Sequence, residues 1–297
     1  MSRIYDALQR ANLERQSAQY ADAAEMAKPF AVQGAEELPP AQEDVLLDKI
    51  SRYAWKPLMS ALPTLGDRGE GIEQFRGLRT QIYQFRDQAP LKTILVSSGM
   101  PSEGKSFVTV NLAMSLARNK NNTVLLMDAD LRKPTLHTIL GAPKLPGLTE
   151  YFAGTAQVKD ILQRNQAPSI VEAGEVRSIP DLTFIPAGAG GDHSSELVAN
   201  HRIDELIASL SPHFDWILID SPPALAVSDA IDLARAADAV LLVAREARTP
   251  FDVAQRAQAA FSNSRILGFV LNAVKDAPSS GSYYYYGRKE AGSGMHG

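Results

Sequence analysis

One short stretch of the sequence carries the residue types and spacing of a phosphate-binding loop. Gly99-Met100-Pro101-Ser102-Glu103-Gly104-Lys105-Ser106 fits the pattern G-x-x-x-x-G-K-[ST]. In such a loop the glycines allow a close approach of the backbone, and successive N–H groups with a helix N-terminus face anionic phosphates. We expect Lys105 to reach the β- and γ-phosphates of a nucleoside triphosphate and the Ser106 hydroxyl to bind Mg²⁺.

Two further segments place carboxylates where they could join this loop. Asp128 and Asp130 follow the apolar run 124–127, and Asp220 follows the apolar run 216–219. Three carboxylates beside a triphosphate need a cation, and Mg²⁺ is the obvious one. We expect Asp220 to hold Mg²⁺ directly or through water, one of Asp128 and Asp130 to complete the metal shell, and the other to accept a proton from an attacking hydroxyl, with Asp128 as the candidate base. The alternative is that each aspartate only caps a turn or a helix.

The elements that must position these residues alternate along the chain. Residues 92–97 form an apolar β-branched run before the loop, and residues 104–119 predict a helix that is apolar on nearly every face. Further strands are expected near 124–127, 183–185, 216–219, 239–243 and 266–271, and helices around 195–210, 228–236 and 251–262. This alternation predicts an α/β fold, a mostly parallel sheet with helices on both faces. Ligands bind such sheets beyond the carboxyl ends of the strands.

The composition bounds the functional classes. The 297 residues are 45% hydrophobic and 22% charged, with a net charge of -4 and no cysteine. Disulfides, thiolate catalysis and cysteine-based metal sites are therefore excluded, and the charge does not favour nucleic acid as a partner. No stretch approaches the roughly 18 apolar residues that span a bilayer. We expect a cytoplasmic protein that reaches a membrane only through a partner.

The segments outside the alternating region have a different character. Residues 1–20 carry Ile4, Leu8 and Ala11 at helical spacing, and such a helix needs a surface to dock on, in its own domain or in a partner. Residues 21–68 are rich in Ala, Glu and Pro and predict a mostly disordered linker. We expect the main domain at 69–277 and a tail at 278–297.

A helix expected at 71–88 carries a charged flank beside its apolar face. Glu73, Arg76 and Arg79 are spaced by three residues and drift along one side of this helix. Such a run is either a solvated surface or a contact between subunits.

The tail contains four consecutive tyrosines, Tyr283, Tyr284, Tyr285 and Tyr286, between Gly- and Ser-rich segments. Neither a helix nor a strand would bury all four, so a mobile tail is expected, with an aromatic end that packs on a neighbour as the alternative. If strand 266–271 is parallel to the others, the tail leaves from the edge that carries the loop. The residues between Val274 and Tyr283 could span roughly 30 Å when extended.

Several of these motifs together resemble one known family. Leu125-Leu126-Met127-Asp128-Ala129-Asp130-Leu131-Arg132 looks like a Walker A′ motif, and Ile217-Leu218-Ile219-Asp220-Ser221-Pro222-Pro223 looks like a Walker B motif. With the loop they resemble the bacterial tyrosine kinases (BY-kinases) of polysaccharide export loci, which are P-loop NTPases of the MinD/ParA type. The resemblance covers about residues 70–290. Glu73, Arg76 and Arg79 match the E-x-x-R-x-x-R oligomerisation motif of that family, and Met1-Ser2-Arg3-Ile4-Tyr5 looks like the start of its stand-alone, exosortase-associated members.

The resemblance implies an ATP- and Mg²⁺-dependent tyrosine autokinase that regulates capsule or exopolysaccharide synthesis and export. It implies phosphorylation of Tyr283–Tyr286 in trans within a ring of subunits. It also implies a membrane activator of the chain-length-determinant type at the inner membrane face and a tyrosine phosphatase as a further partner.

Two rival functions remain, a MinD-like ATPase switch and a non-catalytic nucleotide-binding scaffold for polysaccharide assembly. Met100 stands where the partition ATPases carry their signature lysine, and this, with the tyrosine cluster, favours the kinase. Ser102 stands where the family has glycine and must take a conformation that glycine adopts more easily. Asn272, just past the last expected strand, either helps to bind the nucleotide base or is a turn residue.

Overall fold

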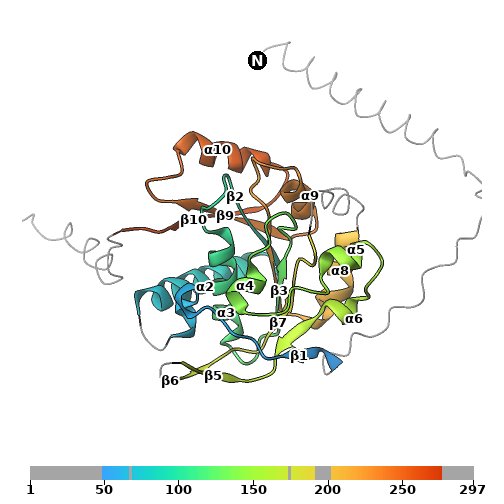
Figure 1. The fold of residues 1–297 in the computed structure, drawn as a ribbon. Coiled ribbons are helices and arrows are strands. Elements are labelled where there is room, and N and C mark those ends of the chain that lie inside the picture. The colour runs from blue at the N-terminus through green and yellow to red at the C-terminus, as the bar shows by residue number, and fades with distance from the viewer. Residues whose placement is uncertain (1–48, 67–68, 173–174, 191–201, 276–297) are drawn as a thin grey trace, which may run out of the picture. The chain divides into compact units, whose positions relative to one another are not determined.

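An eight-stranded sheet organises the residues that the computed structural model describes, 49–66, 69–172, 175–190 and 202–275 (Figure 1). From edge to edge its strands are β1 (Ser51–Tyr53), β4 (Gln163–Asn165), β7 (Leu182–Ile185), β3 (Val124–Asp128), β8 (Trp216–Asp220), β2 (Thr93–Ser98), β9 (Ala239–Arg245) and β10 (Ile266–Asn272). Neighbouring strands are parallel, except that β4 and β7 are antiparallel. The predicted mostly parallel sheet is therefore confirmed.

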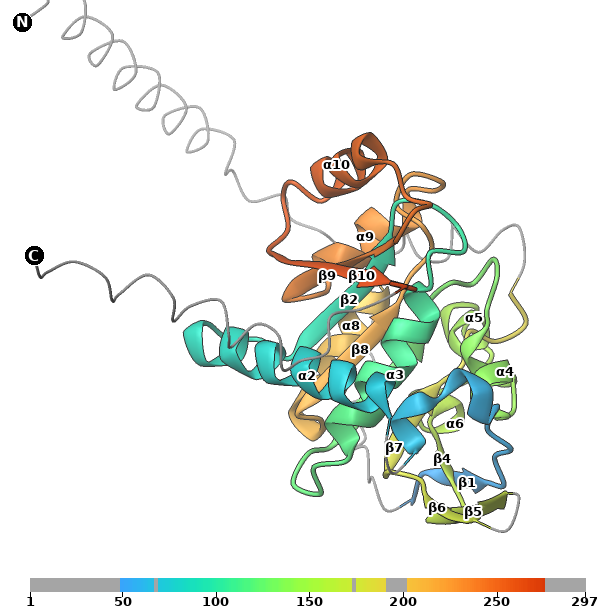
Figure 2. The same cartoon turned by 90° about the vertical axis from the view of Figure 1, so that its left-hand side faces the viewer.

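Helices cover both faces of this sheet (Figure 2). One face is covered by α2 (Glu70–Gln88), α3 (Lys105–Ala117) and α4 (Leu136–Leu140), with the 3₁₀ turns η2 (Met59–Ala61) and η3 (Pro63–Leu65). The other face packs against α5 (Leu148–Phe152), α6 (Val158–Ile161), α8 (Arg202–Leu210), α9 (Asp229–Arg235) and α10 (Phe251–Ala260). The described part also contains the 3₁₀ turn η4 (Ser211–His213) and a hairpin of β5 (Ser169–Glu172) and β6 (Glu175–Ser178).

The central strands are buried on both faces, which explains their continuous apolar sequences. In β2, Ile94 and Val96 belong to the core on the α3 side, whereas Leu95 between them belongs to the opposite core. The last ten residues of α3, from Val108 to Ala117, are buried, as expected for a helix that is apolar on nearly every face. The long predicted elements are confirmed to within one or two residues at most ends.

The folded domain begins earlier than the sequence predicted. Residues 49–66 were expected in the flexible linker, but β1 pairs with β4 and the following residues pack on the α3 face. Trp55 is only 4% exposed, and its ring meets the edge of Phe184 at a centroid distance of 6.1 Å. The linker expectation is wrong for these residues because an irregular segment buries single side chains without a helical or strand period.

Other expectations fall partly or wholly outside the described residues. The helix expected at 195–210 is described only from Arg202, and the helix at 1–20, the linker up to residue 48 and Tyr283–Tyr286 lie outside the described residues. The short elements α4, α5, α6 and β4 and the β5–β6 hairpin were not predicted, because so few residues show no clear period.

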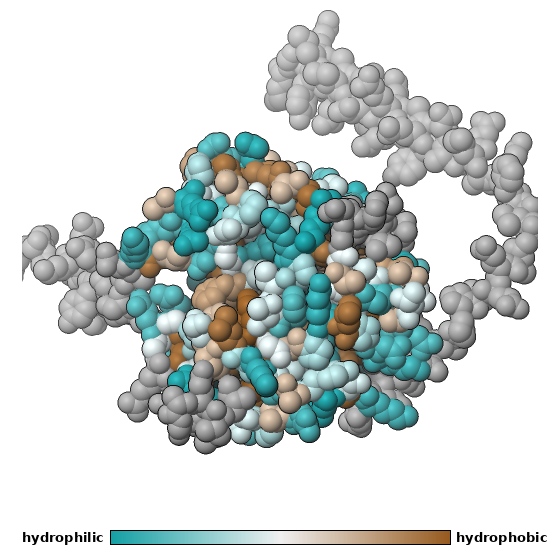
Figure 3. All heavy atoms as spheres, in the orientation of Figure 1, coloured by the Kyte–Doolittle hydropathy of each residue, from teal (hydrophilic) through white to brown (hydrophobic). Residues whose placement is uncertain are grey.

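Among the described residues, none of the helices has the length and apolar character that crossing a bilayer requires. Seen from the side of Figure 1, the surface is mainly hydrophilic, and its apolar side chains form small separate groups (Figure 3).

Candidate active site

The expected phosphate loop joins the central strand β2 to the helix α3, which begins at Lys105. Two residues of the loop have left-handed backbone, Gly104 with φ of 95° and Ser102 with φ of 66°. The expectation that Ser102 adopts a conformation that favours glycine is confirmed. At Gly99 a Cβ atom would lie 2.9 Å from the Val253 side chain, so α10 packs directly against the loop.

The carboxylates meet at the same edge of the sheet, as the sequence predicted. Strand β8 lies between β3 and β2, and Asp128 and Asp220 are register partners at the ends of β3 and β8. Lys105 points among them: its Nζ lies 2.8 Å from Asp130 Oδ2 and 4.0 Å from Asp220 Oδ2, and it donates to Ser106 Oγ at 3.3 Å. The site therefore brings together one cation, one hydroxyl and three carboxylates.

Asp128 is completely buried and only half satisfied. Its Oδ2 accepts the backbone N–H groups of Thr135 and Leu136, at 3.1 and 3.0 Å, where α4 begins. Its Oδ1 is buried and has no hydrogen-bond partner in the described part of the chain. Burial, reinforced by the negative charge of Asp220, raises the pKa of Asp128 well above its ordinary value. Helix capping, the alternative role for this aspartate, explains the two hydrogen bonds of Oδ2 but gives no partner to Oδ1.

Asp220 has the same asymmetry. Its Oδ1 accepts the Thr109 hydroxyl at 3.4 Å, whereas its buried Oδ2 accepts no hydrogen bond from the described residues. Burial raises the pKa of Asp220, and the charge of Lys105 opposes that rise. For Lys105, burial lowers the pKa, but the charges of Asp220 and Asp130 outweigh it and the pKa is raised. The lysine is therefore charged at neutral pH.

The residues around Lys105 fit a magnesium ion whose coordination shell is completed by the phosphate oxygens of a bound nucleotide. The unsatisfied buried Oδ2 of Asp220 and the Ser106 hydroxyl are hard oxygen donors of the kind that Mg²⁺ prefers. The described residues contain no group of three or more His, Cys, Asp or Glu side chains that could hold a metal ion by themselves. Protein Mg²⁺ sites commonly use one or two carboxylates and complete the shell with phosphate oxygens and water.

Asp130 is placed differently from the other two aspartates. Lys105 occupies its Oδ2, and the backbone N–H of Lys133 donates to its Oδ1 at 3.0 Å. Asp128 and Asp220 therefore each offer an unsatisfied oxygen, whereas both oxygens of Asp130 already have donors. This arrangement favours Asp130 as the residue that orients Lys105.

A cavity of about 680 Å³ opens beside these groups. Its polar side carries Lys105, Asp130, Arg132 and Lys133, and its apolar side includes Phe107, Ile139, Pro222, Pro223, Ala226 and Val227. Arg132 also forms an ion pair with Asp229, with 3.4 Å between Nε and Oδ2. The cavity therefore offers charged groups to an anion and an apolar wall to a ring.

The loop is held by a set of side-chain contacts that the sequence did not reveal. Glu103 is 2% exposed, and its carboxylate accepts the backbone N–H of Met100 at 2.8 Å and the hydroxyl of Thr249. Asn272 donates to the carbonyl of Glu103 at 2.9 Å, and Arg245 donates to the carbonyl of Ser102 at 3.2 Å. We call these three partners of the loop, Arg245, Thr249 and Asn272, the loop clamp. They lie more than 140 residues from the loop in sequence, so no local pattern could have indicated them.

Asn272 makes a local contact that agrees with the turn role expected for it and a second contact that the sequence did not predict, while a role toward the nucleotide base stays a prediction. Its Nδ2 holds the loop while its Oδ1 accepts the N–H of Ala273. Because β10 is parallel to β9, this contact also places the end of β10 at the loop edge of the sheet. The expectation that the chain leaves the last strand from that edge is confirmed.

Glu73, Arg76 and Arg79 of α2 do not form one solvated flank. Glu73 and Arg76 form an exposed ion pair at 2.7 Å, whereas Arg79 turns inward and donates to the carbonyl of Ser115 at 2.6 Å. Nothing in these contacts tests a role between subunits.

Comparison with known proteins identifies the family to which this chain is similar. A family model described as ParA, NUBPL iron-transfer P-loop NTPase, matches residues 91–292. Tyrosine-protein kinase YwqD of Bacillus subtilis is 33% identical over 220 residues, which cover 73% of this chain and 87% of YwqD. Tyrosine-protein kinase wzc of Salmonella typhimurium is 33% identical over 218 residues, which cover 72% of this chain and 28% of wzc.

The similarity extends to solved structures. The kinase domain of the Escherichia coli tyrosine kinase ETK matches with a TM-score of 0.59 and 27% identity, over 69% of this chain and 77% of that domain. The chain spans only 26–28% of the length of the first curated relatives that it matches, and most of the length of YwqD. By sequence and by fold, the chain belongs to the bacterial tyrosine-kinase family of ParA-type P-loop NTPases.

Proposed function

We propose that this chain is an autokinase that transfers the γ-phosphoryl group of ATP to tyrosine hydroxyls, those of its own Tyr283–Tyr286 above all. One observation supports this most strongly: Lys105, Asp128 and Asp220 converge at the sheet edge from which β10 leads the chain toward those tyrosines. A tyrosine acceptor also agrees with the names of the relatives, YwqD and ETK.

The loop residues would hold the triphosphate. The N–H groups of the loop and the start of α3 face the phosphates, and the charged Lys105 stabilises negative charge on the γ-phosphoryl group as it leaves ADP. Ser106 and Asp220 are the residues that would hold Mg²⁺, with Asp130 keeping Lys105 in position. When bound, Mg²⁺ neutralises charge on the β- and γ-phosphate oxygens.

Asp128 would accept the proton of the attacking phenol. A neutral phenol with a pKa of about 10 is a weak nucleophile, so a base beside it lowers the barrier. The raised pKa of Asp128 suits this role, because a general base works best when its pKa lies close to the working pH. Its unsatisfied Oδ1 is the atom that would take the proton.

The acceptor can reach the site. Tyr283 follows Lys275, the end of the described chain, by eight positions, and a stretch of this length can span roughly 27 Å when extended. The apolar wall of the cavity, with Phe107 and Ile139, offers a surface for a phenol ring. We place the transfer in trans within a homo-oligomer whose contacts include Glu73, Arg76 and Arg79.

We extend the proposal to the setting of the enzyme. Its role would be to regulate capsule or exopolysaccharide synthesis and export from the cytoplasmic side of the inner membrane. A membrane activator of the chain-length-determinant type would recruit it, and a tyrosine phosphatase would reverse the modification. The resemblance of the motifs to BY-kinases supports these partners.

Other functions are less well supported. A MinD-like ATPase switch would share the loop and the aspartates, but the chain has Met100 at the place of the signature lysine. A nucleotide-binding scaffold would not need Asp128 with a free buried oxygen. The family model's description also names iron transfer. Cysteine is the usual ligand of iron–sulfur clusters, and this sequence contains none, so it gives no support to that function.

The test incubates the full chain with ATP labelled at the γ-position and follows where the label goes. The kinase predicts labelled phosphotyrosine on the protein, lost when Tyr283–Tyr286 are replaced by Phe and lost with Lys105→Met. A switch would release labelled free phosphate and leave the protein unlabelled. A scaffold would bind ATP but would produce neither labelled protein nor labelled free phosphate.

A further inference from the structure

The last strand of the sheet, β10, has an open edge. In the described part of the chain it pairs with β9, and no strand lies beyond it. Its seven residues include neither a charged residue nor a proline. Natural sheets usually protect an edge with charges, prolines or short strands, because unpaired N–H and C=O groups attract another strand. The opposite edge follows this rule, since β1 has three residues and one of them is Arg52.

Both faces of β10 are apolar at this edge. Phe269 is the register partner of Leu242, which belongs to the core on the α10 side, and Leu271 shares that face two residues later. Phe269 is 42% exposed and Leu271 is 57% exposed. On the other face, Leu267 and Val270 pack with the core on the α2 side. A strand added to this edge would therefore meet apolar side chains on both of its faces.

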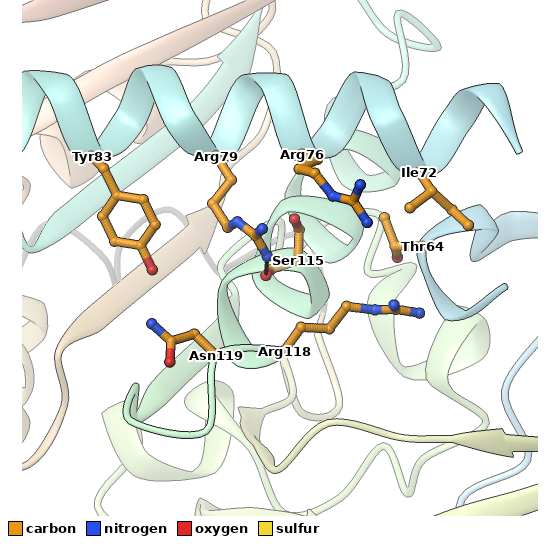
Figure 4. A pocket seen from close by; sticks show the side chains of 8 residues that line it. All are labelled: Thr64, Ile72, Arg76, Arg79, Tyr83, Ser115, Arg118 and Asn119. Carbon is orange, nitrogen blue, oxygen red and sulfur yellow. Dashed lines mark hydrogen bonds between the residues drawn. The ribbon is translucent and has the colours of Figure 1, made fainter. Parts of the chain in front are cut away.

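A groove of about 310 Å³ lies between β10 and α2. Its apolar lining includes Leu267 and Val270 of β10 and Leu78, Ile82 and Phe85 of α2. The side of α2 that carries Arg76, Arg79 and Tyr83 is turned toward α3 instead (Figure 4). The groove is thus separate from the charged side of α2, and none of the phosphate-loop residues lines it.

The segment that follows β10 has the composition that suits this edge. The described chain ends at Lys275, three residues after β10, and Tyr283–Tyr286 follow a stretch that contains Pro278 and Gly281. Proline and glycine favour a reversal of the chain, and tyrosine favours strands. Four consecutive residues of a strand direct two side chains to each face. A strand beside β10 would therefore give an apolar contact to all four rings.

We propose that Tyr283–Tyr286 pair with the open edge of β10 as an antiparallel strand, with two rings in the groove beside α2 and two rings against Phe269 and Leu271. The tail of the same chain is favoured over a second copy, because its short connection to β10 gives it a high effective concentration at this edge. An antiparallel strand leads back from the end of β10, away from the edge of the sheet that carries Lys105. Docking therefore keeps the tyrosines apart from the phosphate loop.

Docking gives the kinase a resting state, and this consequence rests on the proposed function. A phosphate adds about -1.5 to -2 charges to a tyrosine, and burying a charge in an apolar groove is costly. The unmodified tail therefore occupies the edge of β10, whereas the phosphorylated tail leaves it.

The test measures amide hydrogen exchange by mass spectrometry in the full chain. All proteins carry Lys105→Met, so docking is measured in unphosphorylated protein whether or not the chain is a kinase. Every second N–H of an edge strand points away from its neighbour and is protected only if a further strand pairs with it. The readouts are exchange in the peptides that contain residues 266–272 and 283–287. The two tail variants replace Tyr283–Tyr286 by Ser or by Phe.

We expect the serine variant to speed exchange of the outward N–H groups of β10 by about 5–10-fold, while the phenylalanine variant keeps the rings and the protection. Leu271→Ser should speed exchange at residues 283–287. Its exposed position keeps the fold intact. Phe251→Ser on α10, where Phe251 is 78% exposed, is the matched control and should change neither peptide.

Three results would overturn the proposal. Equal exchange of β10 with tyrosine and with serine in the tail would show that the tail does not cover the edge. Protection that survives the serine change and grows with protein concentration would assign the edge to a second copy. Equal effects of Phe251→Ser and Leu271→Ser would show that the contact is not specific to β10. If docking is seen but the wild-type chain makes no phosphotyrosine from ATP, the proposed function fails and the docking site stands.

Discussion

At the scale of single residues, the site keeps groups that a stable core would avoid. Asp128 is fully buried beside Asp220, and each has an oxygen without a hydrogen bond from the described chain. Burying an unsatisfied carboxylate costs free energy of folding, and its raised pKa expresses that cost. The residue that we propose as the base therefore destabilises the nucleotide-free protein at neutral pH.

This cost predicts that Asp128→Asn raises stability while it removes activity. A carboxyl with a raised folded-state pKa binds its proton more tightly in the folded chain, so its stabilising contribution is present below the unfolded pKa near 3.8 and is lost as pH rises through the folded pKa. We expect Asp128→Asn to raise the Tm by about 2–4 °C at pH 8. Phosphorylation should fall by about 10²–10⁴-fold.

The comparison is made by thermal unfolding without nucleotide at pH 5 and at pH 8. The Tm advantage of Asp128→Asn should be smaller at pH 5, where wild-type Asp128 is more often protonated. Asp252→Asn, an exposed change on α10, should leave the Tm unchanged at both values. A lower Tm for Asp128→Asn at pH 8 would contradict this account.

The loop clamp gives a second prediction at this scale. Thr249→Val keeps the shape of the side chain but removes the hydroxyl that donates to Glu103. A hydrogen bond to a charged group contributes about 1.5–3 kcal/mol, part of which should appear as weaker ATP binding, by about 3–10-fold. Because the clamp shapes the loop without touching the acceptor, the KM for ATP should rise more than kcat falls.

Thr249→Ser supplies the control, because serine restores the hydroxyl. Isothermal titration with ATP and Mg²⁺ compares the three proteins. If the serine and valine variants bind ATP equally, the hydroxyl does not position the loop.

At the scale of elements, the segment 49–66 belongs to the folded domain. Trp55, Leu62 and Leu65 are buried in the same core as α3, and the backbone N–H of Trp55 donates to the side-chain Oδ1 of Asn165 at 3.0 Å. This segment covers the face on which α3 positions the loop. It should therefore contribute to stability as a core element does.

Trp55→Ala should destabilise the protein by about 3–5 kcal/mol, the usual range for removing a buried tryptophan. Leu58→Ala, three residues later, should cost less than about 1 kcal/mol, because Leu58 is 51% exposed. Urea unfolding of both variants checks the difference. Similar losses for both would mean that the segment is not packed as described.

Local patterns predicted the elements that bear the chemistry, because a phosphate loop between a strand and a helix and an aspartate after an apolar strand are visible within a few residues. They also predicted that Asp128 and Asp220 share one edge, since parallel strands end together. The contacts of Glu103 with Thr249 and of Trp55 with Phe184 join residues far apart in sequence and follow no period. The antiparallel strand β4 was missed because three residues carry no alternation of their own.

At the scale of the whole molecule, the proposed transfer in trans predicts that subunits meet through the side of α2 that carries Glu73, Arg76 and Arg79. Arg76→Glu reverses the charge at an exposed position, whose ion pair with Glu73 contributes no more than about 1 kcal/mol to folding. We expect this variant to remain folded and to shift the protein toward the monomer, with a lower rate of tail phosphorylation. Light scattering measures the mass, and Arg256→Glu on α10 is the matched control.

An unchanged mass for Arg76→Glu would show that the motif lies outside the contact. A mass that falls equally for Arg256→Glu would indicate a general effect of charge.

The central claim is that one sheet edge holds the nucleotide and delivers its phosphoryl group to the tyrosines beyond β10. Its most direct test is phosphopeptide mapping of the full chain, wild type and Lys105→Met, after incubation with ATP and Mg²⁺. The account predicts phosphate on Tyr283–Tyr286 in the wild type and none in Lys105→Met. A wild-type chain that hydrolyses ATP while these tyrosines stay unmodified would contradict it.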